Sequence, residues 1–193
     1  MAKIGLKCLT YAPFTSGGEA TTVVYGAGFM LNDYMIRADI NEARDDAKFH
    51  ADDHQIDADN SMSGATLNLE LANMNDALEQ AFLGYKAVTT ASGSDINITA
   101  ASAGFVGVGF YRKERFKGDI TYKCFWFYKV QFRRDSDSTN TKGENTDFQT
   151  ETLNGDAVGV TLTTAGDVIY YVTARKNSEA DAVTWLKAKA GIS

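Results

Sequence analysis

The sequence predicts a single, mostly β domain with one flanking α-helix and a short C-terminal helix. The chain of 193 residues contains 11 Phe, 9 Tyr and 17 Gly but one Pro, which favours pleated strands joined by tight turns. Hydrophobic residues make up 44% and occur along the whole length, enough for one ordinary core. Several segments alternate apolar and polar residues with the period of a half-buried strand. We recognise no internal repeat and treat residues 1–193 as one domain.

The first 60 residues are predicted to contain a hairpin followed by a long acidic loop. Residues 3–9 alternate as a short strand, which Pro13 and the turn at residues 16–18 close. Residues 21–25 are rich in β-branched side chains and form the expected return strand. Between about residues 28 and 60 apolar residues are sparse, so we expect a long excursion with little core of its own.

An amphipathic strand and a helix follow this acidic loop. Residues 65–71 place their apolar side chains on one face and their polar side chains on the other. Apolar residues then recur every four positions, as in a helix that Asn73 or Asn75 can cap and Gly84 can end. Residues 88–102 are rich in Thr, Ser, Ala and Asn and predict a weak strand or a surface loop.

The strongest β signals are residues 104–113 and 120–132, which form a long predicted hairpin around a polar turn. One face of its second arm is apolar, while Phe125 and Phe127 interrupt an otherwise polar opposite face. Both faces should therefore be partly covered. This pattern is typical of a two-layer sandwich or of burial against neighbouring subunits.

The last third of the chain begins with an exposed polar loop at residues 133–147, which lacks apolar anchors. Three short strands are expected after it, at residues 148–153, 157–162 and 168–173. Ser178 and Asp181 have the spacing of a capping box and predict a terminal helix that docks on the sheet.

The net charge of −6 is concentrated in one part of the sequence. Residues 28–60 contain nine acidic and three basic residues, whereas acidic and basic residues balance in the rest of the chain. Such a segment repels phosphate over a Debye length of about 10 Å at 0.1 M salt. Specific nucleic-acid binding by this segment is therefore not expected, and a solvated loop is the plainer interpretation.

Motifs for catalysis, metals and cofactors are weak, and we predict none of the three. His50 and His54 are four residues apart, but no third metal ligand is recognisable. The runs Asp57-Ala58-Asp59 and Asp135-Ser136-Asp137 begin like calcium loops without the later Gly and Glu. The glycines at 104, 107 and 109 do not match a dinucleotide fingerprint and instead permit close approach of another backbone within a strand.

Cys8 and Cys124 are too few for a disulfide framework and are interpreted as small buried apolar residues. The first residues lack the apolar run of a secretion signal, and no stretch is long and apolar enough to span a bilayer. We therefore expect a protein made in the cytoplasm that does not enter a membrane.

Several segments, in order along most of the chain, resemble the major tail protein family of siphophages. They are KIGLKCLTYAP from Lys3, Ala51-Asp52-Asp53, Gly64-Ala65-Thr66-Leu67, Leu83-Gly84, GFVGVGFYRKERFKGDITYKCFWFYKVQF from Gly104, TKGENTDFQTETLNG from Thr141, and Ala182 with Trp185-Leu186. The acidic segment before Ala51 departs from the family pattern, and no immunoglobulin-like domain follows.

The resemblance implies a β-sandwich or partly closed barrel that assembles into stacked hexameric rings around a lumen. It implies a virion tail protein of the tail tube, made in the host cytoplasm, through which DNA passes during ejection. The implied partners are other copies of the chain, the tape measure protein, the tail terminator and the distal tail protein.

Two sets of charged residues are candidates for contacts in such an assembly. The candidates for the lumen or for an axial contact between rings are Asp39, Glu42, Asp45 and Asp46. The candidates for an inter-ring or intersubunit loop are Arg133, Arg134, Asp135, Asp137, Lys142 and Glu144. Both sets lie in segments too polar to build a core.

Two other functional classes stay open at this point. The first is a ligand- or carbohydrate-binding β-sandwich module, in which Phe125 and Phe127 would form an exposed aromatic platform. The second is an enzyme that uses paired carboxylates in residues 28–60, which would require a pocket and opposed pKa values.

Overall fold

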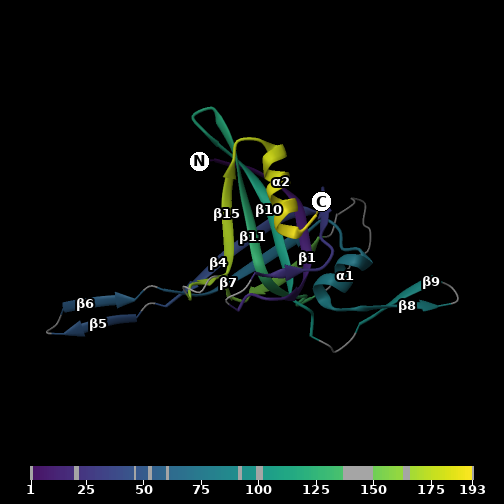
Figure 1. Cartoon of the computed structure of the whole chain (residues 1–193), viewed down its shortest axis with the longest axis horizontal. Coiled ribbons are helices and arrows are strands. Elements are labelled where there is room, and N and C mark those ends of the chain that lie inside the picture. Colours follow the sequence, from purple (N-terminus) through teal and green to yellow (C-terminus); the bar gives the residue numbers. More distant parts are fainter. Residues whose placement is uncertain are drawn as a thin grey trace, which may run out of the picture.

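The computed structural model describes residues 2–19, 22–45, 47–51, 54–59, 61–90, 93–98, 102–136, 150–162 and 166–192. At its centre lies a strongly curved antiparallel sheet of nine strands in the order β2-β1-β10-β11-β12-β7-β4, with β3 beside β1 and β15 beside β11 (Figure 1). These strands are β1 (Ala2–Ser16), β2 (Val24–Tyr25), β3 (Phe29–Leu31), β4 (Met35–Arg44), β7 (Met62–Leu71), β10 (Val106–Phe116), β11 (Asp119–Arg133), β12 (Glu151–Ala157) and β15 (Tyr171–Lys176).

Three small hairpins and two helices complete the described part of the chain. The hairpins are β5 (Ala47–Ala51) with β6 (His54–Asp59), β8 (Lys86–Thr90) with β9 (Gly93–Asn97), and β13 (Val160–Thr161) with β14 (Val168–Ile169). The helices are α1 (Asp76–Leu83) and α2 (Glu179–Ala190). The mostly β class with two helices is thus confirmed, and among the described strands the sheet does not close into a barrel.

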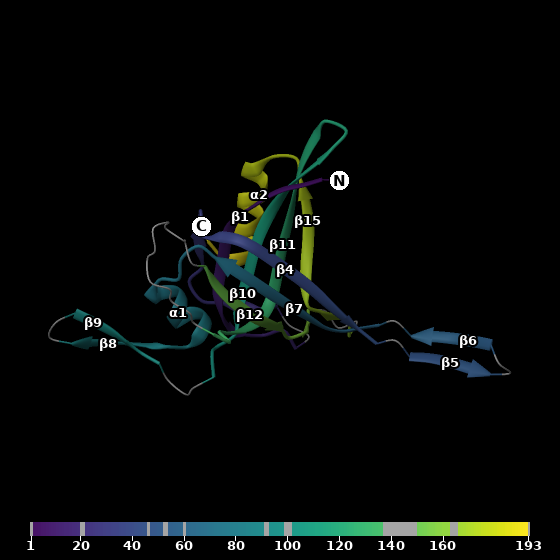
Figure 2. The same cartoon turned by 180° about the vertical axis from the view of Figure 1, so that it is seen from behind.

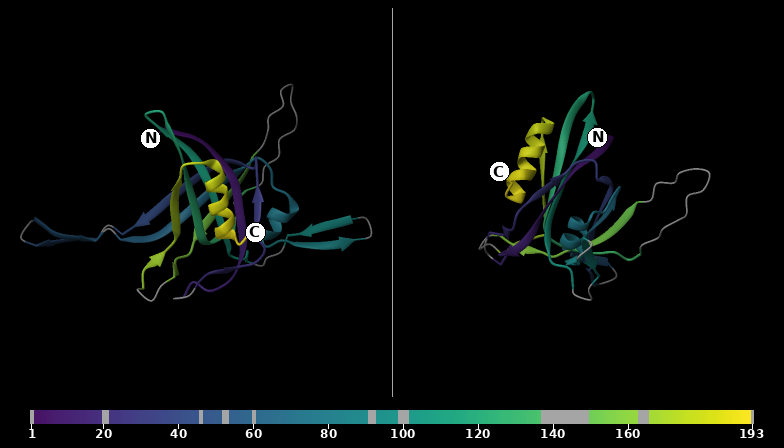
Figure 3. Two further views of the ribbon diagram at one scale, coloured as in Figure 1. Left: turned by 45° about the horizontal axis from the view of Figure 1, so that its top comes forward. Right: turned by 90° about the vertical axis from the view of Figure 1, so that its right-hand side faces the viewer.

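The long β10–β11 hairpin forms the middle layer and is covered on both faces within one chain (Figure 3). On one face, Phe125 and Phe127 belong to a core shared with the leucines of β7 and with Phe82 of α1. On the other face, Trp126 packs with Leu186 of α2. Burial within the chain therefore explains the two apolar faces of β11.

Both predicted helices form with the expected caps. The Asn75 side chain accepts a hydrogen bond from the backbone nitrogen of Leu78 at 3.0 Å, and Gly84 ends α1 in the left-handed conformation with φ 72°. The Ser178 hydroxyl accepts from the backbone nitrogen of Asp181 at 3.1 Å and donates to its carboxylate at 2.7 Å. Local sequence signals were sufficient here because a cap involves residues close together in the chain.

The prediction of a long acidic loop at residues 28–60 is wrong. Residues Met35–Arg44 form β4, which pairs with β7 along its whole length, and the segment continues into the β5–β6 hairpin. Ala38 and Ile40 pack against the core while charged neighbours face solvent. The sequence does alternate here, with Ile36, Ala38 and Ile40 between polar residues, but the acidic character of the surrounding segment favoured a loop in the prediction.

The bounds of several other strands differ from those predicted from the sequence. The first strand runs from Ala2 to Ser16 and includes Pro13, whereas its return strand is limited to Val24–Tyr25. Within the predicted range 88–102, residues 88–90 and 93–97 belong to the β8–β9 hairpin, and the described part of the strand expected from residue 148 begins at Glu151. The strand expected at 157–162 is reduced to β13, and that at 168–173 is divided between β14 and β15.

The glycines of β10 make room chiefly for a side chain. A Cβ atom at Gly109 would lie 2.5 Å from Cε3 of Trp126, and one at Gly107 would lie 2.8 Å from Cζ2 of the same ring. The close approach at these positions is therefore made mainly by side chains, by Trp126 at Gly109 and by Tyr25 at Gly107, where Cε1 of Tyr25 would lie 2.5 Å from the Cβ atom. The carbonyl oxygen of Phe125 also lies 2.8 Å from the Gly109 position.

Candidate assembly surfaces

We call residues 45–60 the acidic arm. Its described part, Asp45 with the β5–β6 hairpin, projects from the body beyond the ends of β4 and β7 (Figure 2). The backbone nitrogen of Asp45 donates to the carbonyl oxygen of Ser61 at 2.9 Å and closes the base of the arm. Within the described residues, β5 and β6 hydrogen-bond only to each other, and so do β8 and β9. The β8–β9 hairpin leaves the body on the opposite side (Figure 1).

The structure divides the four acidic candidates between strand β4 and the arm. In β4, Asp39 pairs with Arg37 at 2.8 Å and Glu42 pairs with Arg44 at 2.6 Å, so this strand carries no net charge. Asp45 is exposed at the base of the arm, and Asp46 lies outside the described residues. The arm contains six aspartates and one lysine and therefore carries most of the net charge of the chain.

Glu42 also connects β4 with β15, because the Tyr171 hydroxyl donates to its carboxylate. This hydrogen bond and the Arg44 guanidinium lower the pKa of Glu42. Burial, together with the Glu42 contact, raises the pKa of Tyr171 to about 12. Glu42 therefore stays ionised, with its charge directed to partners in the same chain.

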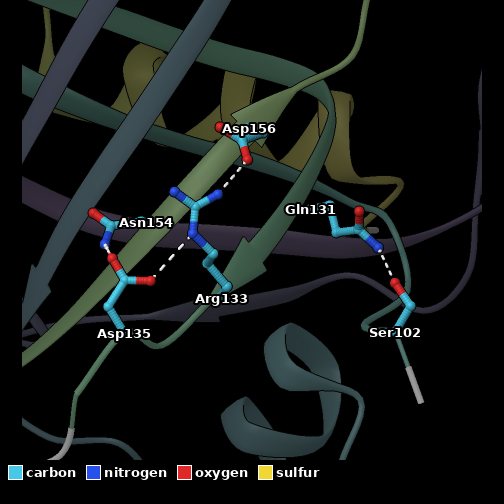
Figure 4. A network of polar contacts seen from close by, with 6 residues as sticks. All are labelled: Ser102, Gln131, Arg133, Asp135, Asn154 and Asp156. Atoms are coloured by element: carbon cyan, nitrogen blue, oxygen red, sulfur yellow. Dashed lines mark hydrogen bonds and ion pairs between the residues drawn. The ribbon is translucent and has the colours of Figure 1, made fainter. Parts of the chain in front are cut away.

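The first residues of the predicted polar loop are bound to the body of their own subunit (Figure 4). Arg133 pairs with Asp135 at 3.1 Å and with Asp156 at 2.6 Å, and Asn154 donates to Asp135 at 2.5 Å. Asp137, Lys142 and Glu144 lie outside the described residues.

Arg134 is the exception to the prediction that this loop is exposed and without anchors. Its side chain is only 12% exposed. It pairs with Glu79 of α1 at 2.9 Å and with Glu151 of β12 at 3.5 Å. Its role in the folded chain is therefore to join a helix to the sheet.

The sequence analysis did not identify a basic surface on the middle layer, in the half of the β10–β11 hairpin that lies nearer its turn. We call it the basic face and define it by Lys3, Arg112, Lys123 and Arg175 around the buried carboxylate of Glu114. Lys123 is directly opposite Arg112 of β10 on one side and Arg175 of β15 on the other. The pairing of β10, β11 and β15 therefore aligns Arg112, Lys123 and Arg175 in one row. The pairing between β11 and β15 could not be predicted from the sequence.

Contacts within the basic face hold the cations in place. Arg112 pairs with Glu114 at 2.8 Å, and Arg175 approaches the same carboxylate at 3.6 Å. The Arg112 guanidinium and the Lys123 ammonium both lie over the Phe125 ring, 5.1 Å and 5.2 Å from its centroid. The basic face is thus positioned by the sheet beneath it.

A groove of about 390 Å³ separates the basic face from β4. Lys3, Leu6 and Arg112 line one side, and residues of β4 that include Asp39 line the other. Among the predicted site residues, Asp39 is therefore brought close to the basic face. Its carboxylate is paired with Arg37.

The structure contradicts the aromatic platform of the alternative binding-module hypothesis. Phe125 is 4% exposed and Phe127 is fully buried, because β4, β7 and α1 cover that face of β11. His50 and His54 lie on the paired strands β5 and β6. In the described part of the chain no group of three or more His, Cys, Asp or Glu residues is placed to hold a metal ion.

Both cysteines are free and buried, as predicted. Burial raises the pKa of the Cys8 thiol and raises that of Cys124 to about 11. Both thiols are therefore protonated at neutral pH and act as core residues.

Comparison with protein-family models gives no match for this chain, and a search of curated proteins finds no relative. Across the residues that the structure describes, none of the helices has the length and apolar character needed to cross a membrane.

Proposed function

We propose that this chain is a major tail protein of a siphophage, a structural subunit that polymerises as stacked hexameric rings into the tail tube. The observation that carries the proposal is the pair of projecting two-stranded hairpins, β5–β6 and β8–β9, on opposite sides of the body. The resemblance of the segments from Lys3, Gly104 and Thr141 to that family supports it independently.

The physical argument concerns the stability of these hairpins. An isolated two-stranded hairpin is marginally stable in water, because it has no second layer against which to bury side chains. Contact with a neighbouring subunit supplies that layer. A contact between a projecting hairpin and a different surface of the next copy is heterologous, and repeated contacts of this kind close into rings or continue as a helical filament.

Sheet edges give the same assembly a second set of contacts. Among the described strands, β4 and β15 each pair on one side only and leave the other edge open. Open edges are aggregation hazards in a monomer, and pairing them between subunits removes the hazard. In the proposed tube these edges contribute to a barrel shared by the subunits of a ring.

The proposed tube lies in the virion tail and is assembled from subunits made in the host cytoplasm. Its proposed partners are the tape measure protein within the lumen, the tail terminator at the head end and the distal tail protein at the tip. DNA passes through the lumen without specific binding.

Negative-stain microscopy of the purified chain at increasing concentration tests the proposal. We expect rings or smooth tubes of uniform width. The matched variant replaces residues 46–60 with Asn-Gly, which joins Asp45 to Ser61 by a tight turn at the existing hydrogen bond. This variant should keep the circular dichroism spectrum and cooperative melting of the body but form no tubes. Wild-type protein that stays monomeric at every protein and salt concentration, also with tail components present, would contradict the proposal.

A further inference from the structure

The row of Arg112, Lys123 and Arg175 places three cations side by side across three strands. Like charges directly opposite each other in a sheet are destabilising, because their Cβ atoms lie only about 4.5–5.5 Å apart. Glu114 is the carboxylate that pairs with the row, and it faces both Arg112 and Arg175. With Lys3 included, the basic face carries four positive charges and one negative charge.

The row is open to solvent on the side of Arg175 and Lys3. In Figure 2 strand β4 crosses the lower part of the layer, and the N-terminal end of β1, which pairs with β10, runs across its upper part. Arg175 is 57% exposed and Lys3 is exposed, so both charges face solvent beside the groove of about 390 Å³. An anionic partner can therefore reach the row.

We infer that the basic face of one subunit binds the acidic arm of a neighbouring copy. The arm carries six aspartates and one lysine, so its charge complements the net positive charge of the basic face. Its two strands also need a surface on which to pack.

The arm of the same chain cannot make this contact. It continues outward from the ends of β4 and β7, whereas the basic face lies toward the tip of the β10–β11 hairpin (Figure 1). The contact therefore joins two different surfaces of two copies. This inference rests on the proposed function, because it assigns the side-by-side contact between subunits of the proposed ring.

Two charge-reversed variants test the contact. The first, Asp57→Lys with Asp59→Lys, reverses two charges of the arm. The second, Lys3→Glu with Lys123→Glu, reverses two charges of the basic face. The Lys123→Glu change puts a carboxylate between Arg112 and Arg175 and should raise the melting temperature, whereas Lys3→Glu puts a carboxylate opposite the buried Glu114 and should lower it. Cooperative melting of the second variant is therefore checked before its assembly is measured.

Each variant alone should raise the concentration needed for assembly by at least about tenfold, because like charges then meet across the contact. An equimolar mixture should restore assembly, since each reversed surface then finds a complementary one on the other variant. The matched control is Lys7→Glu with Lys117→Glu, which makes the same change in net charge as the second variant at exposed positions outside the arm, the basic face and the β8–β9 hairpin. This control should assemble like the wild type.

The outcomes separate this inference from the proposed function. If the wild type assembles and both charge variants assemble equally well, the docking contact is refuted and the proposed function stands. If the wild type never assembles, both are refuted. If a short DNA duplex binds the wild type, and the Lys3→Glu/Lys123→Glu variant loses DNA binding while keeping assembly, the basic face binds nucleic acid and the inference is wrong.

Discussion

The clearest test of the core is the replacement of Gly109 by alanine. The added Cβ atom would lie 2.5 Å from Cε3 of Trp126 and 2.8 Å from Cδ2 of Leu186, both far inside contact distance. The Trp126 ring cannot move freely, because its Nε1 donates to the Tyr25 hydroxyl at 3.1 Å. The Tyr25 hydroxyl in turn donates to the carbonyl oxygen of Tyr128 at 2.8 Å.

The expected cost follows from these contacts. Overpacking by one methyl group in a well-packed core costs about 1–3 kcal/mol. Losing the Trp126–Tyr25 hydrogen bond as the ring shifts adds about 1 kcal/mol. The total cost is therefore about 2–4 kcal/mol, and for a chain of this length each kcal/mol lowers the melting temperature by about 2–4 °C, so we expect a decrease of roughly 4–16 °C.

Thermal unfolding followed by circular dichroism measures this effect, with Gly104→Ala as the matched control. A Cβ atom at Gly104 meets nothing within 4 Å, so this variant should melt at or slightly above the wild-type temperature. Equal melting temperatures for Gly109→Ala and Gly104→Ala would refute the close packing of Trp126 on β10.

Three further predictions concern side-chain contacts. Arg134→Met should lower the free energy of unfolding in urea by about 1–2 kcal/mol, because it leaves two partly buried carboxylates, whereas Arg133→Met at an exposed site should cost at most about 1 kcal/mol. The Tyr171 hydroxyl lowers the pKa of Glu42 in the folded chain, and the Tyr111 hydroxyl lowers that of Glu179. Each ionised glutamate therefore stabilises the folded chain above its unfolded pKa, and this stabilisation is lost as the pH falls through its folded pKa. Urea titrations from pH 6 to pH 3 should therefore show a smaller loss of stability for Tyr171→Phe with Tyr111→Phe than for the wild type, and parallel curves would contradict this linkage. Neither Cys8 nor Cys124 should react with a thiol reagent at pH 8 until urea unfolds the chain, because burial raises the pKa of both thiols. Rapid labelling of the native protein would contradict this prediction.

Sequence reasoning succeeded where the relevant contacts are local. The caps at Asn75 and Ser178, the left-handed Gly84 and the long β10–β11 hairpin all depend on residues close in the chain. The class of fold followed from the same signals. The apolar faces of β11 also indicated correctly that both sides are covered.

The failures involve partners distant in the chain. Strand β4 lies in a strongly charged segment that was predicted as a loop, and its pairing with β7 could not be read from the local sequence. The polar character of Arg134 predicted exposure, yet two glutamates from other elements bury it. The basic face required the pairing of β11 with β15, so the sequence showed its cations without their alignment.

The pairing of β1 with β10 also determines the order in which the chain can fold during synthesis. Pro13 of β1 lies opposite Val106, so the strand emerges from the ribosome long before its main partner exists. At a synthesis rate of about 5–20 residues per second, this delay is on the order of 10 s. Until β10 arrives, one edge of the first strand stays exposed, and until β15 and α2 are made the outer face of β11 is bare. A nascent chain therefore cannot present a complete basic face, which delays contact between subunits until translation is nearly finished.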